Sequence, residues 1–180
     1  MIMIMSESLA DRLRKMAGRE QQLMAGNILF RAGDPVISIF LVAAGSLQLI
    51  RVLPQGSRLT LQRAGPGAIL AEASLVADRY HCDATAVEDS ILHVVPLRRL
   101  RADLRDDPDL ASALTRHLAY EVHRARAQAE MLSLKTVAER VDAWLTLNDS
   151  SLPPRGRWRQ VASDIGVSPE ALYRELARRR

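Results

Sequence analysis

The pattern of apolar residues changes at Pro96, and this change constrains the fold more than any other feature of the sequence. Between residues 26 and 96, short apolar runs alternate with turns rich in Gly, Pro, Asp and Ser. Runs about 8–12 residues apart are typical of an antiparallel sandwich or barrel, not of alternating strands and helices. The runs are ILF at 28–30, SIFLVA at 38–43, LQLIRVL at 47–53, RLTL at 58–61 and ILHVV at 91–95.

After Pro96 the apolar residues recur at helical spacing, and a long helix is predicted over residues 108–133. Asp107 is a candidate N-cap, and Pro108 suits the first helical position, where no N–H is needed. Five residues of this helix step by four, three, four and three, which is the spacing of a heptad seam. We expect the seam to face a second copy in a parallel or near-parallel homodimer; the alternative is a helix packed on its own domain. The seam residues are Leu118, Val122, Ala125, Ala129 and Leu132.

A further helix is predicted at about 134–147, followed by a linker, DSSLPPRG, at 149–156. The last residues then fit two short helices joined by a turn containing Gly166, which is the pattern of a helix-turn-helix. Ser168 is a candidate N-cap for the second helix, with Pro169 at its first position. The predicted buried side consists of Val161, Ile165, Val167, Leu172 and Leu176.

All the excess positive charge of the chain lies in this C-terminal segment. Residues 155–180 contain seven Arg and three acidic residues, whereas residues 1–154 contain 18 basic and 18 acidic residues. Arginines clustered on one element are typical of a phosphate-binding surface. The alternative is a basic helix face that is simply exposed to water.

Glu170 and Arg174 lie one helical turn apart on the expected outward face of the second short helix. In a helix-turn-helix this helix enters the major groove, where Arg bonds guanine and Glu accepts from cytosine. The alternative is an ion pair within the helix, worth about 0.2–0.5 kcal/mol. The predicted DNA contacts are Arg157 and Arg159 at the start of the first helix, and Glu170, Tyr173, Arg174 and Arg178 on the second.

Several classes of protein are excluded or disfavoured. No apolar run reaches the length of about 18–20 residues that a membrane span requires, and the start of the chain lacks the pattern of a signal peptide. The single cysteine, Cys82, cannot form an internal disulfide, which fits a cytoplasmic location. We find no Walker loop, HExxH sequence, paired CxxC or catalytic triad pattern, so we predict that the chain is not an enzyme.

Over roughly residues 20–180, the order of parts and several motifs resemble the Crp/Fnr family of bacterial transcription regulators. The resemblance implies an α+β fold: a double-stranded β-helix (jelly roll) sensor domain at 1–107, a dimerisation helix at 108–133 and a DNA-binding domain at 134–180. It also implies a phosphate contact for Ser168 and base contacts for Glu170 and Arg174. The motifs are Gly26, Gly33-Asp34, Gly45, Gly56, GPG at 65–67, AEASL at 71–75, AVEDS at 86–90 and SPEALYR at 168–174.

Two departures from the family pattern stand out. Cyclic-nucleotide-binding members carry a Gly-Glu-x-(Gly/Ser)-Leu sequence followed by Arg-(Ser/Thr)-Ala, whereas this chain has Ala71 at the first Gly and Tyr80-His81-Cys82 at the second motif. Tyr80 offers one neutral donor where Arg would donate two charge-assisted bonds, so we do not expect cyclic-nucleotide binding. The helix-turn-helix also lacks an obvious wing, because the sequence stops at Arg180. The candidate effector pocket consists of Glu72, Ser74, Arg79, Tyr80, His81 and Cys82.

Cys82 permits three interpretations. Nearby Arg79 and His81 could lower the thiol pKa and make it a redox or electrophile sensor. A haem or metal ligand is the second interpretation, and a small buried hydrophobe is the third. An iron–sulfur cluster is excluded because one cysteine is too few, and no other metal site is predicted.

These observations together predict a dimeric, cytoplasmic transcription regulator that binds double-stranded DNA. An unknown effector in the β domain would change how the dimerisation helices pack and re-space the two recognition helices. RNA polymerase is a further candidate partner. The alternative is a β-domain interaction module whose helical tail mediates assembly without reading DNA sequence.

Overall fold

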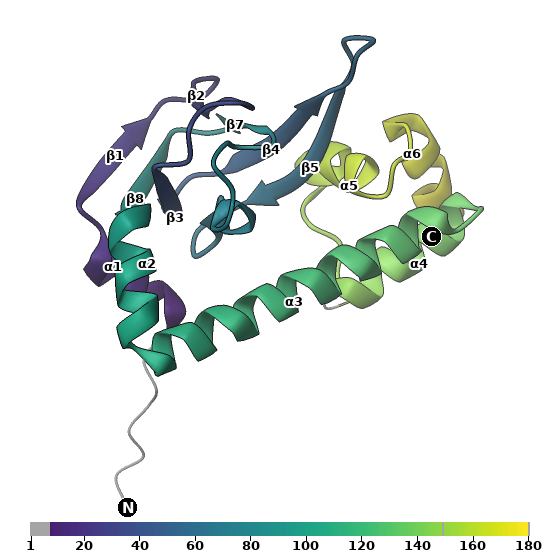
Figure 1. The fold of residues 1–180 in the computed structure, drawn as a ribbon. Helices are drawn as coiled ribbons and strands as arrows, with labels where there is room; N and C mark the ends of the chain where they lie inside the picture. The colour runs from purple at the N-terminus through teal and green to yellow at the C-terminus, as the bar shows by residue number, and fades with distance from the viewer. Residues whose placement is uncertain (1–7, 149, 180) are drawn as a thin grey trace, which may run out of the picture. The chain divides into compact units, whose positions relative to one another are not determined.

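The computed structural model describes residues 8–148 and 150–179, and the chain divides into two compact units (Figure 1). One unit extends to Leu118 and the other begins at Ala119, so the division falls inside the long helix and not at either of its ends. Residues 1–7, the apolar start for which no signal peptide is predicted, lie outside the described residues.

Among the described residues, eight strands form two four-stranded antiparallel sheets in the first unit, and we call them the β roll. One sheet has the order β1–β8–β3–β6 and the other β2–β7–β4–β5. This arrangement confirms the expected jelly roll. The strands are β1 (Arg19–Leu23), β2 (Ile28–Phe30), β3 (Ser38–Ala44), β4 (Leu47–Val52), β5 (Arg58–Ala64), β6 (Ile69–Leu70), β7 (Asp83–Ala86) and β8 (Ser90–Pro96).

The helices next to the β roll explain the continuous apolar run in β3. This strand lies between β8 and β6, and its first five residues are all buried. The flanking helices α1 (Leu9–Met16) and α2 (Leu97–Asp106) both contact β3, so this strand has no solvent-exposed face over these residues. A strand buried on both faces needs apolar residues without alternation. Strand β5, by contrast, is exposed or half-buried along most of its length.

The turn between β3 and β4 depends on a glycine in the left-handed region. Gly45 has a φ of +80°, and a Cβ atom there would lie 2.3 Å from the carbonyl oxygen of Asp89 and 2.7 Å from the Cα of Ser90. The turn therefore packs directly on the backbone that precedes β8, and only a residue without a side chain fits.

Four elements of the first unit were not predicted from the sequence: α1, β1, β6 and β7. β1 reads REQQL and is largely polar, while β6 and β7 are only two and four residues long. α1 has a clear cap, since the Ser8 hydroxyl accepts a 3.2 Å hydrogen bond from the Asp11 amide. It buries Leu13 and Met16 against the β roll.

The long helix α3 spans Pro108–Ser133, the range expected from the sequence. Its start has the predicted cap, because the Leu110 amide donates to Asp107 Oδ1 at 2.9 Å. Asp107 also pairs with Arg12 of α1 at 2.8 Å. These bonds lower the pKa of the Asp107 carboxyl, the Leu110 amide contributing most.

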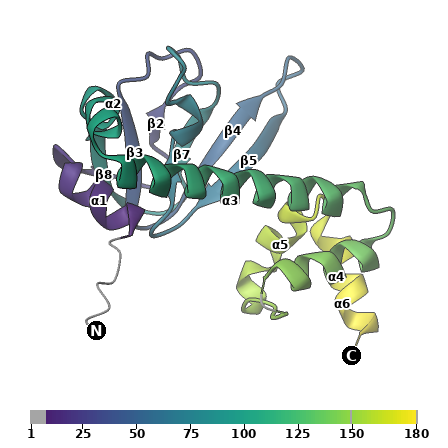
Figure 2. The same cartoon turned by 60° about the horizontal axis from the view of Figure 1, so that its bottom comes forward.

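The second unit contains the end of α3 and a small helical domain (Figure 2). The other elements of this domain are α4 (Val137–Leu147), the 3-10 turn η2 (Arg155–Arg157), α5 (Trp158–Asp164) and α6 (Pro169–Arg178). α4 begins with a capping box between Thr136 and Glu139, in which each side chain bonds the other residue's backbone amide. The core of the domain comprises Met131, Val141, Trp144, Val161, Ala162, Ile165, Leu172 and Leu176. Among the described residues, no helix is both long and apolar enough to cross a membrane.

Candidate nucleic-acid interface and β-roll pocket

Helices α5 and α6 are joined by a tight turn that ends one helix and redirects the chain into the next. The Gly166 amide donates to Ser163 at 3.2 Å and the Val167 amide donates to Ala162 at 2.9 Å. Gly166 has a φ of +65°, the left-handed conformation expected where α5 stops. The buried residues Ala162 and Leu172 hold the two helices together.

The first turn of α6 is capped as the sequence predicts. Ser168 is extended, and its hydroxyl accepts a 3.2 Å hydrogen bond from the Ala171 amide, with Pro169 at the first helical position. Leu172 and Leu176 are buried, so the opposite face of α6 is presented to solvent. Glu170, Arg174 and Arg178 are exposed on α6, and Arg157 and Arg159 are exposed at the start of α5.

Glu170 and its neighbours form a charged group on this exposed face. The pKa of the Glu170 carboxyl is lowered, first by a hydrogen bond from its own backbone amide and next by the Ser168 hydroxyl. The positive charges of Arg159 and Arg174 lower it further. The carboxyl of Glu170 thus lies near three other predicted residues: Ser168 and Arg174 of the α6 segment and Arg159 of α5.

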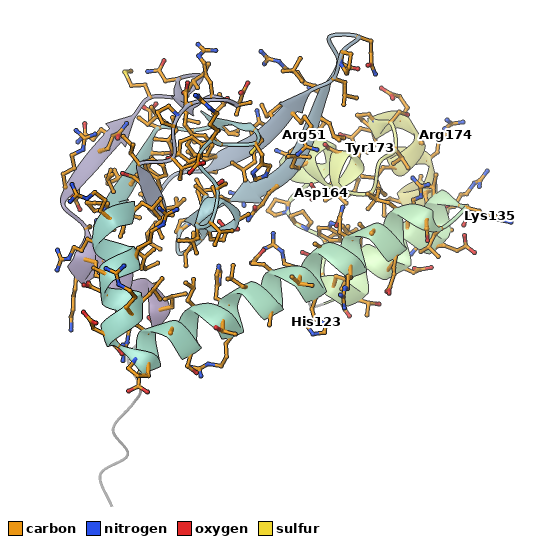
Figure 3. The ribbon with its side chains drawn as sticks, viewed as in Figure 1. Arg51, His123, Lys135, Asp164, Tyr173 and Arg174 are labelled. Atoms are coloured by element: carbon orange, nitrogen blue, oxygen red, sulfur yellow. The ribbon has the colours of Figure 1, made fainter. Side chains whose placement is uncertain are left out.

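Tyr173 differs from expectation, because its ring does not stand free on the outward face. Its ring lies 5.7 Å from that of Trp158 at an interplanar angle of 41°, and the residue is half-buried. Figure 3 labels Tyr173 and its neighbour Arg174. Trp158 is itself held by a 3.0 Å hydrogen bond from its indole N–H to the carbonyl of Pro153. The Arg155 guanidinium lies 5.7 Å from the Trp158 ring, so Arg155 joins this group although the sequence did not indicate it. The spacing of three residues between Arg155 and Trp158 was the sequence signal that could have indicated this contact.

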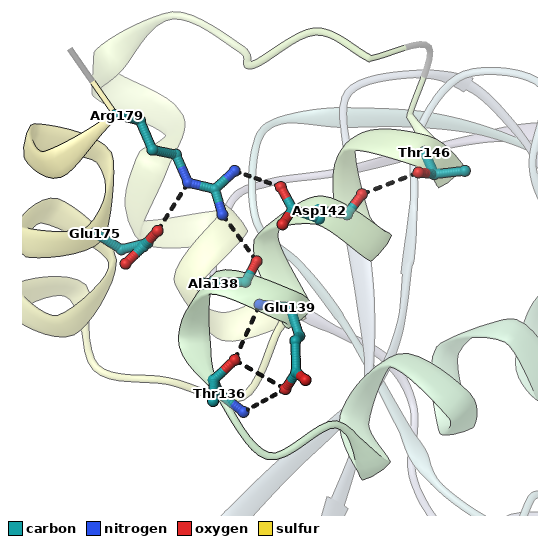
Figure 4. Close-up of polar contacts among 7 residues, drawn as sticks. All are labelled: Thr136, Ala138, Glu139, Asp142, Thr146, Glu175 and Arg179. Carbon is teal, nitrogen blue, oxygen red and sulfur yellow. Dashed lines mark hydrogen bonds and ion pairs between the residues drawn. The ribbon is translucent and has the colours of Figure 1, made fainter.

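Arg179 is one of the arginines of the basic C-terminal segment, but its side chain bonds other residues of the helical domain (Figure 4). Its guanidinium donates to the carboxylates of Asp142 and Glu175 and to the carbonyl of Ala138 at 2.9 Å. It therefore joins the end of α6 to α4, and its charge is balanced within the domain. The remaining exposed arginines of this segment supply the positive surface.

The β roll contains a cavity of about 100 Å³ where the sequence predicts an effector pocket. Five of the six predicted residues line it, together with Phe30: Glu72, Ser74, Tyr80, His81 and Cys82. Arg79 does not line it, which corrects the prediction. Its guanidinium instead donates to the Gly33 carbonyl at 2.6 Å. Residues 79–82 form no regular strand, and the backbone of Arg79 makes only an isolated bridge to Pro35.

The Tyr80 side chain fills part of this site. Its ring stacks on that of Phe30 with centroids 3.9 Å apart, and its hydroxyl donates to the Ser38 carbonyl at 2.8 Å. Tyr80 is only 5% exposed, and burial raises its pKa. The Tyr80 hydroxyl, which the sequence suggested as a donor to a ligand, therefore donates to the protein backbone.

Cys82 is buried and does not have the low pKa that a thiolate sensor needs. The residue is 2% exposed, and burial is the main reason that the pKa of its thiol is raised. Arg51 acts in the opposite direction but does not outweigh burial. The small-hydrophobe interpretation fits this environment best. Among the described residues, no group of three or more His, Cys, Asp or Glu side chains could hold a metal ion.

Ala71, the residue in place of the family glycine, adopts a left-handed backbone with φ +68° and ψ +14°. This conformation costs a residue with a side chain about 1–2 kcal/mol. Ala71 immediately precedes the short 3-10 helix η1 (Glu72–Ser74), which forms one wall of the cavity. Ala71 therefore adopts a left-handed turn conformation although it carries a side chain.

The seam of α3 exposes apolar side chains. Val122 is 48% and Leu132 40% exposed, Ala125 and Ala129 are also exposed, and Leu118 is half-buried. Leu132 has a second contact: a Cβ atom on Gly166 would lie 3.0 Å from its Cδ2. The seam residue nearest the end of α3 therefore also supports the turn before α6.

Comparisons with known proteins agree with this architecture. The family model for the cyclic nucleotide-binding domain matches residues 20–107. The cyclic AMP receptor protein of Thermus thermophilus is 32% identical over 155 residues, which cover 84% of this chain and 72% of that protein. The transcriptional activator protein anr of Pseudomonas aeruginosa is 27% identical over 178 residues, covering 93% of this chain and 73% of that protein.

A solved structure extends the agreement to the fold. FixK2 from Bradyrhizobium japonicum superposes with a TM-score of 0.75 at 22% identity, covering 89% of this chain and 83% of that chain. Its identity is low, so this match supports the fold alone. The sequence relatives carry the functional assignment, because they are regulators matched along most of their length. The chain belongs to the Crp/Fnr family of transcription regulators.

Proposed function

We propose that this protein is a homodimeric, sequence-specific DNA-binding regulator in which α6 enters the major groove. The observation that carries the proposal is the exposed face of the capped helix α6, which presents Glu170 and Arg174 next to the exposed Arg159 of α5. Major-groove readers place such groups at the N-terminal part of the second helix, where they meet base edges. Ser168, Arg157, Arg159 and Arg178 would contact phosphates, and Tyr173 would position this face through Trp158.

The dimer proposal rests on the exposed seam of α3. Val122 and Leu132 leave apolar surface in water, and the small residues Ala125 and Ala129 allow a second helix to approach closely. Two copies paired through this seam would offer two recognition helices to adjacent major grooves. Residues 1–107, 108–133 and 134–180 would then act as sensor, dimerisation and DNA-binding parts. A cytoplasmic location and a contact to RNA polymerase belong to the same proposal.

DNA binding by this protein, we further propose, does not depend on a cyclic nucleotide. Its cavity of about 100 Å³ is well below the roughly 300–1,000 Å³ of small-molecule sites. No arginine is among the described residues that line it, and Tyr80 is bonded to Ser38. A cyclic phosphate would therefore meet a buried aromatic ring instead of a charged fork.

Thermal unfolding with cyclic AMP tests this second proposal directly. We expect no shift in the melting temperature at millimolar cyclic AMP, because a ligand that binds only the folded state must raise it. A reproducible upward shift, or stronger operator binding when cyclic AMP is added, would overturn the proposal.

The main experiment is selection of bound duplexes from a random-sequence pool at near-physiological salt. We expect enrichment of an inverted repeat with half-sites about one helical turn apart, since a two-fold dimer imposes that spacing. Binding that weakens with salt but enriches no sequence would contradict the proposal. It would favour the assembly-module alternative, in which the basic helix has no readout role.

A further inference from the structure

The C-terminal end of α5 is capped by side chains from two other helices. Gln128 of α3 donates from Nε2 to the Asp164 carbonyl at 2.6 Å. Arg140 of α4 donates from Nη1 to the carbonyls of Ile165 and Gly166 at 3.1 and 3.3 Å. The last carbonyls of a helix have no partner within that helix, so these bonds satisfy groups that would otherwise need water.

The same arginine also bonds the end of α3. Arg140 donates from Nε to the Leu134 carbonyl at 2.9 Å, one residue past the last residue of α3. One guanidinium thus joins carbonyls at the C-terminal ends of α3 and α5. Each end carries partial negative charge from its helix dipole, which a cation there stabilises. The planar fork of Arg can bond both ends at once, whereas the single ammonium of Lys is a point charge.

Apolar packing brings the same segments close together. A Cβ atom on Gly166 would lie 3.0 Å from Leu132 Cδ2 and 3.4 Å from Arg140 Nη1. The end of α3 therefore lies directly against the turn that precedes α6. All of these contacts lie within the second unit, between residues 128 and 166.

We propose that Gln128 and Arg140 are positioning residues for DNA recognition, which hold the turn before α6 on the end of α3. This inference rests on the proposed sequence-specific binding by α6. Its consequence is that α6 takes its orientation from α3, the helix that would carry the dimer seam. The spacing of two recognition helices would then be set by the α3 pair through this contact.

The structure separates this positioning role from a role in folding. Val161, Ile165 and Leu172 are almost completely buried, so α5 and α6 pack on one another without Arg140. Arg140 is only half-buried, and its three bonds go to backbone carbonyls at helix ends. Losing them should loosen the placement of α6 and leave its fold intact.

The test compares Arg140→Met with Arg140→Lys in the full chain. The selected operator and a random duplex serve as probes, and binding to each is measured over a range of salt concentrations. Arg105→Met is the charge-matched control, because Arg105 is an exposed residue of α2 in the other unit. Gln128→Leu provides a second variant that leaves Arg140 in place. Circular dichroism and melting curves check that every variant folds.

For Arg140→Met we expect operator affinity to fall by about tenfold or more, as when a good base contact is lost. Binding to the random duplex should change no more than in Arg105→Met, and tolerance for altered half-site spacing should increase. Arg140→Lys should recover part of the operator affinity, and Gln128→Leu should show a smaller loss in the same direction.

Two results would overturn the inference. One is that Arg140→Met has the same operator affinity and the same half-site spacing preference as Arg105→Met. The other is an equal loss on both probes, which would indicate that Arg140 only supports the fold. Failure of the proposed function itself looks different, because the wild-type protein would then select no operator at all.

Discussion

At the scale of single residues, several polar side chains of the β roll are bonded to the protein's own backbone. Arg79 bonds the Gly33 carbonyl and Tyr80 bonds the Ser38 carbonyl. Each joins segments more than 40 residues apart in the chain. These bonds remove from the pocket the two donors that a phosphate group would use. Of the two, Tyr80 stands at the first position of the family's Arg-(Ser/Thr)-Ala motif, so the residue at that position bonds the protein's own backbone.

Gly45 and Gly56 form a matched pair for testing the turn between β3 and β4. Both have φ near +80°, but a side chain on Gly45 would overlap Asp89 and Ser90, whereas Gly56 has no atom within 4 Å. Gly56→Ala should cost about 1–2 kcal/mol from its backbone conformation alone. Gly45→Ala should cost about 1–3 kcal/mol more, because the added methyl overpacks the turn. Urea unfolding of both variants measures the difference, and equal losses would contradict the clash.

Cys82 should react slowly with thiol reagents in the folded protein. Burial limits access and raises the thiol pKa, so little thiolate forms at neutral pH. We expect labelling by Ellman's reagent at pH 8 to be more than about tenfold slower than in denaturant. Since folding favours the neutral thiol, its contribution to stability is complete below the ordinary thiol pKa. It is lost as pH rises through the raised value. Labelling as fast as in the unfolded chain would revive the sensor interpretation.

At the scale of secondary-structure elements, the helix ends carry the most informative hydrogen bonds. Ser168 caps α6, the Thr136–Glu139 box caps α4, and Asp107 caps α3. Because side chains near the ends are already bonded, the directions in which these helices start are well defined. In the proposed complex with DNA, the exposed residues of α5 and α6 would divide into those that face a base edge and those that face phosphates.

Arg174→Ala and Arg157→Ala should separate these two classes of contact. Loss of Arg174 should relax selectivity at one base position by about 1–3 kcal/mol, because Arg reads guanine through two bonds. Loss of Arg157 should weaken binding to all sequences and lower the salt slope by about one. Titrations of both variants against operator and single-base changes measure this. Wild-type behaviour in both would show that the assignment of α6 as the recognition helix is wrong.

At the scale of the whole molecule, the exposed seam of α3 determines which assembly we expect. Val122 and Leu132 lie on the seam, while Tyr120 is exposed two residues from Val122 and points to another side of the helix. Exposed apolar residues that repeat at heptad spacing fit a partner helix better than scattered ones do. Pairing of two copies through this seam would make the functional protein a homodimer.

Val122→Asp should therefore convert the protein into a monomer in solution. A carboxylate at the seam would be buried without a partner in the dimer, which is strongly unfavourable. Tyr120→Asp is the matched control and should leave the mass unchanged. Sedimentation or light scattering gives the mass, and a dimer that persists in Val122→Asp would exclude the α3 seam as the interface.

The local pattern of the sequence was sufficient for the features that depend on near neighbours. The range of α3, the cap at Ser168, the turn at Gly166 and five of the β-roll strands (β2, β3, β4, β5 and β8) follow from periodicity, capping and turn residues. Short polar strands such as β1 left no such pattern, because pairing with β8 stabilises them and their own residues do not. The exposed charges of α6 were predictable because helical spacing alone places them on the face opposite Leu172 and Leu176.

Tertiary structure alone decided where the polar side chains of the candidate sites make their bonds. Arg79, Tyr80 and Arg179 each bond a group about 40 residues away, and Tyr173 packs on Trp158 from another helix. Cys82 has a raised pKa because the fold buries it, although its sequence neighbours suggested the opposite. Sequence spacing determines which face of an element a residue occupies. Only the packed fold determines what that face meets, because burial and hydrogen-bond partners come from distant parts of the chain.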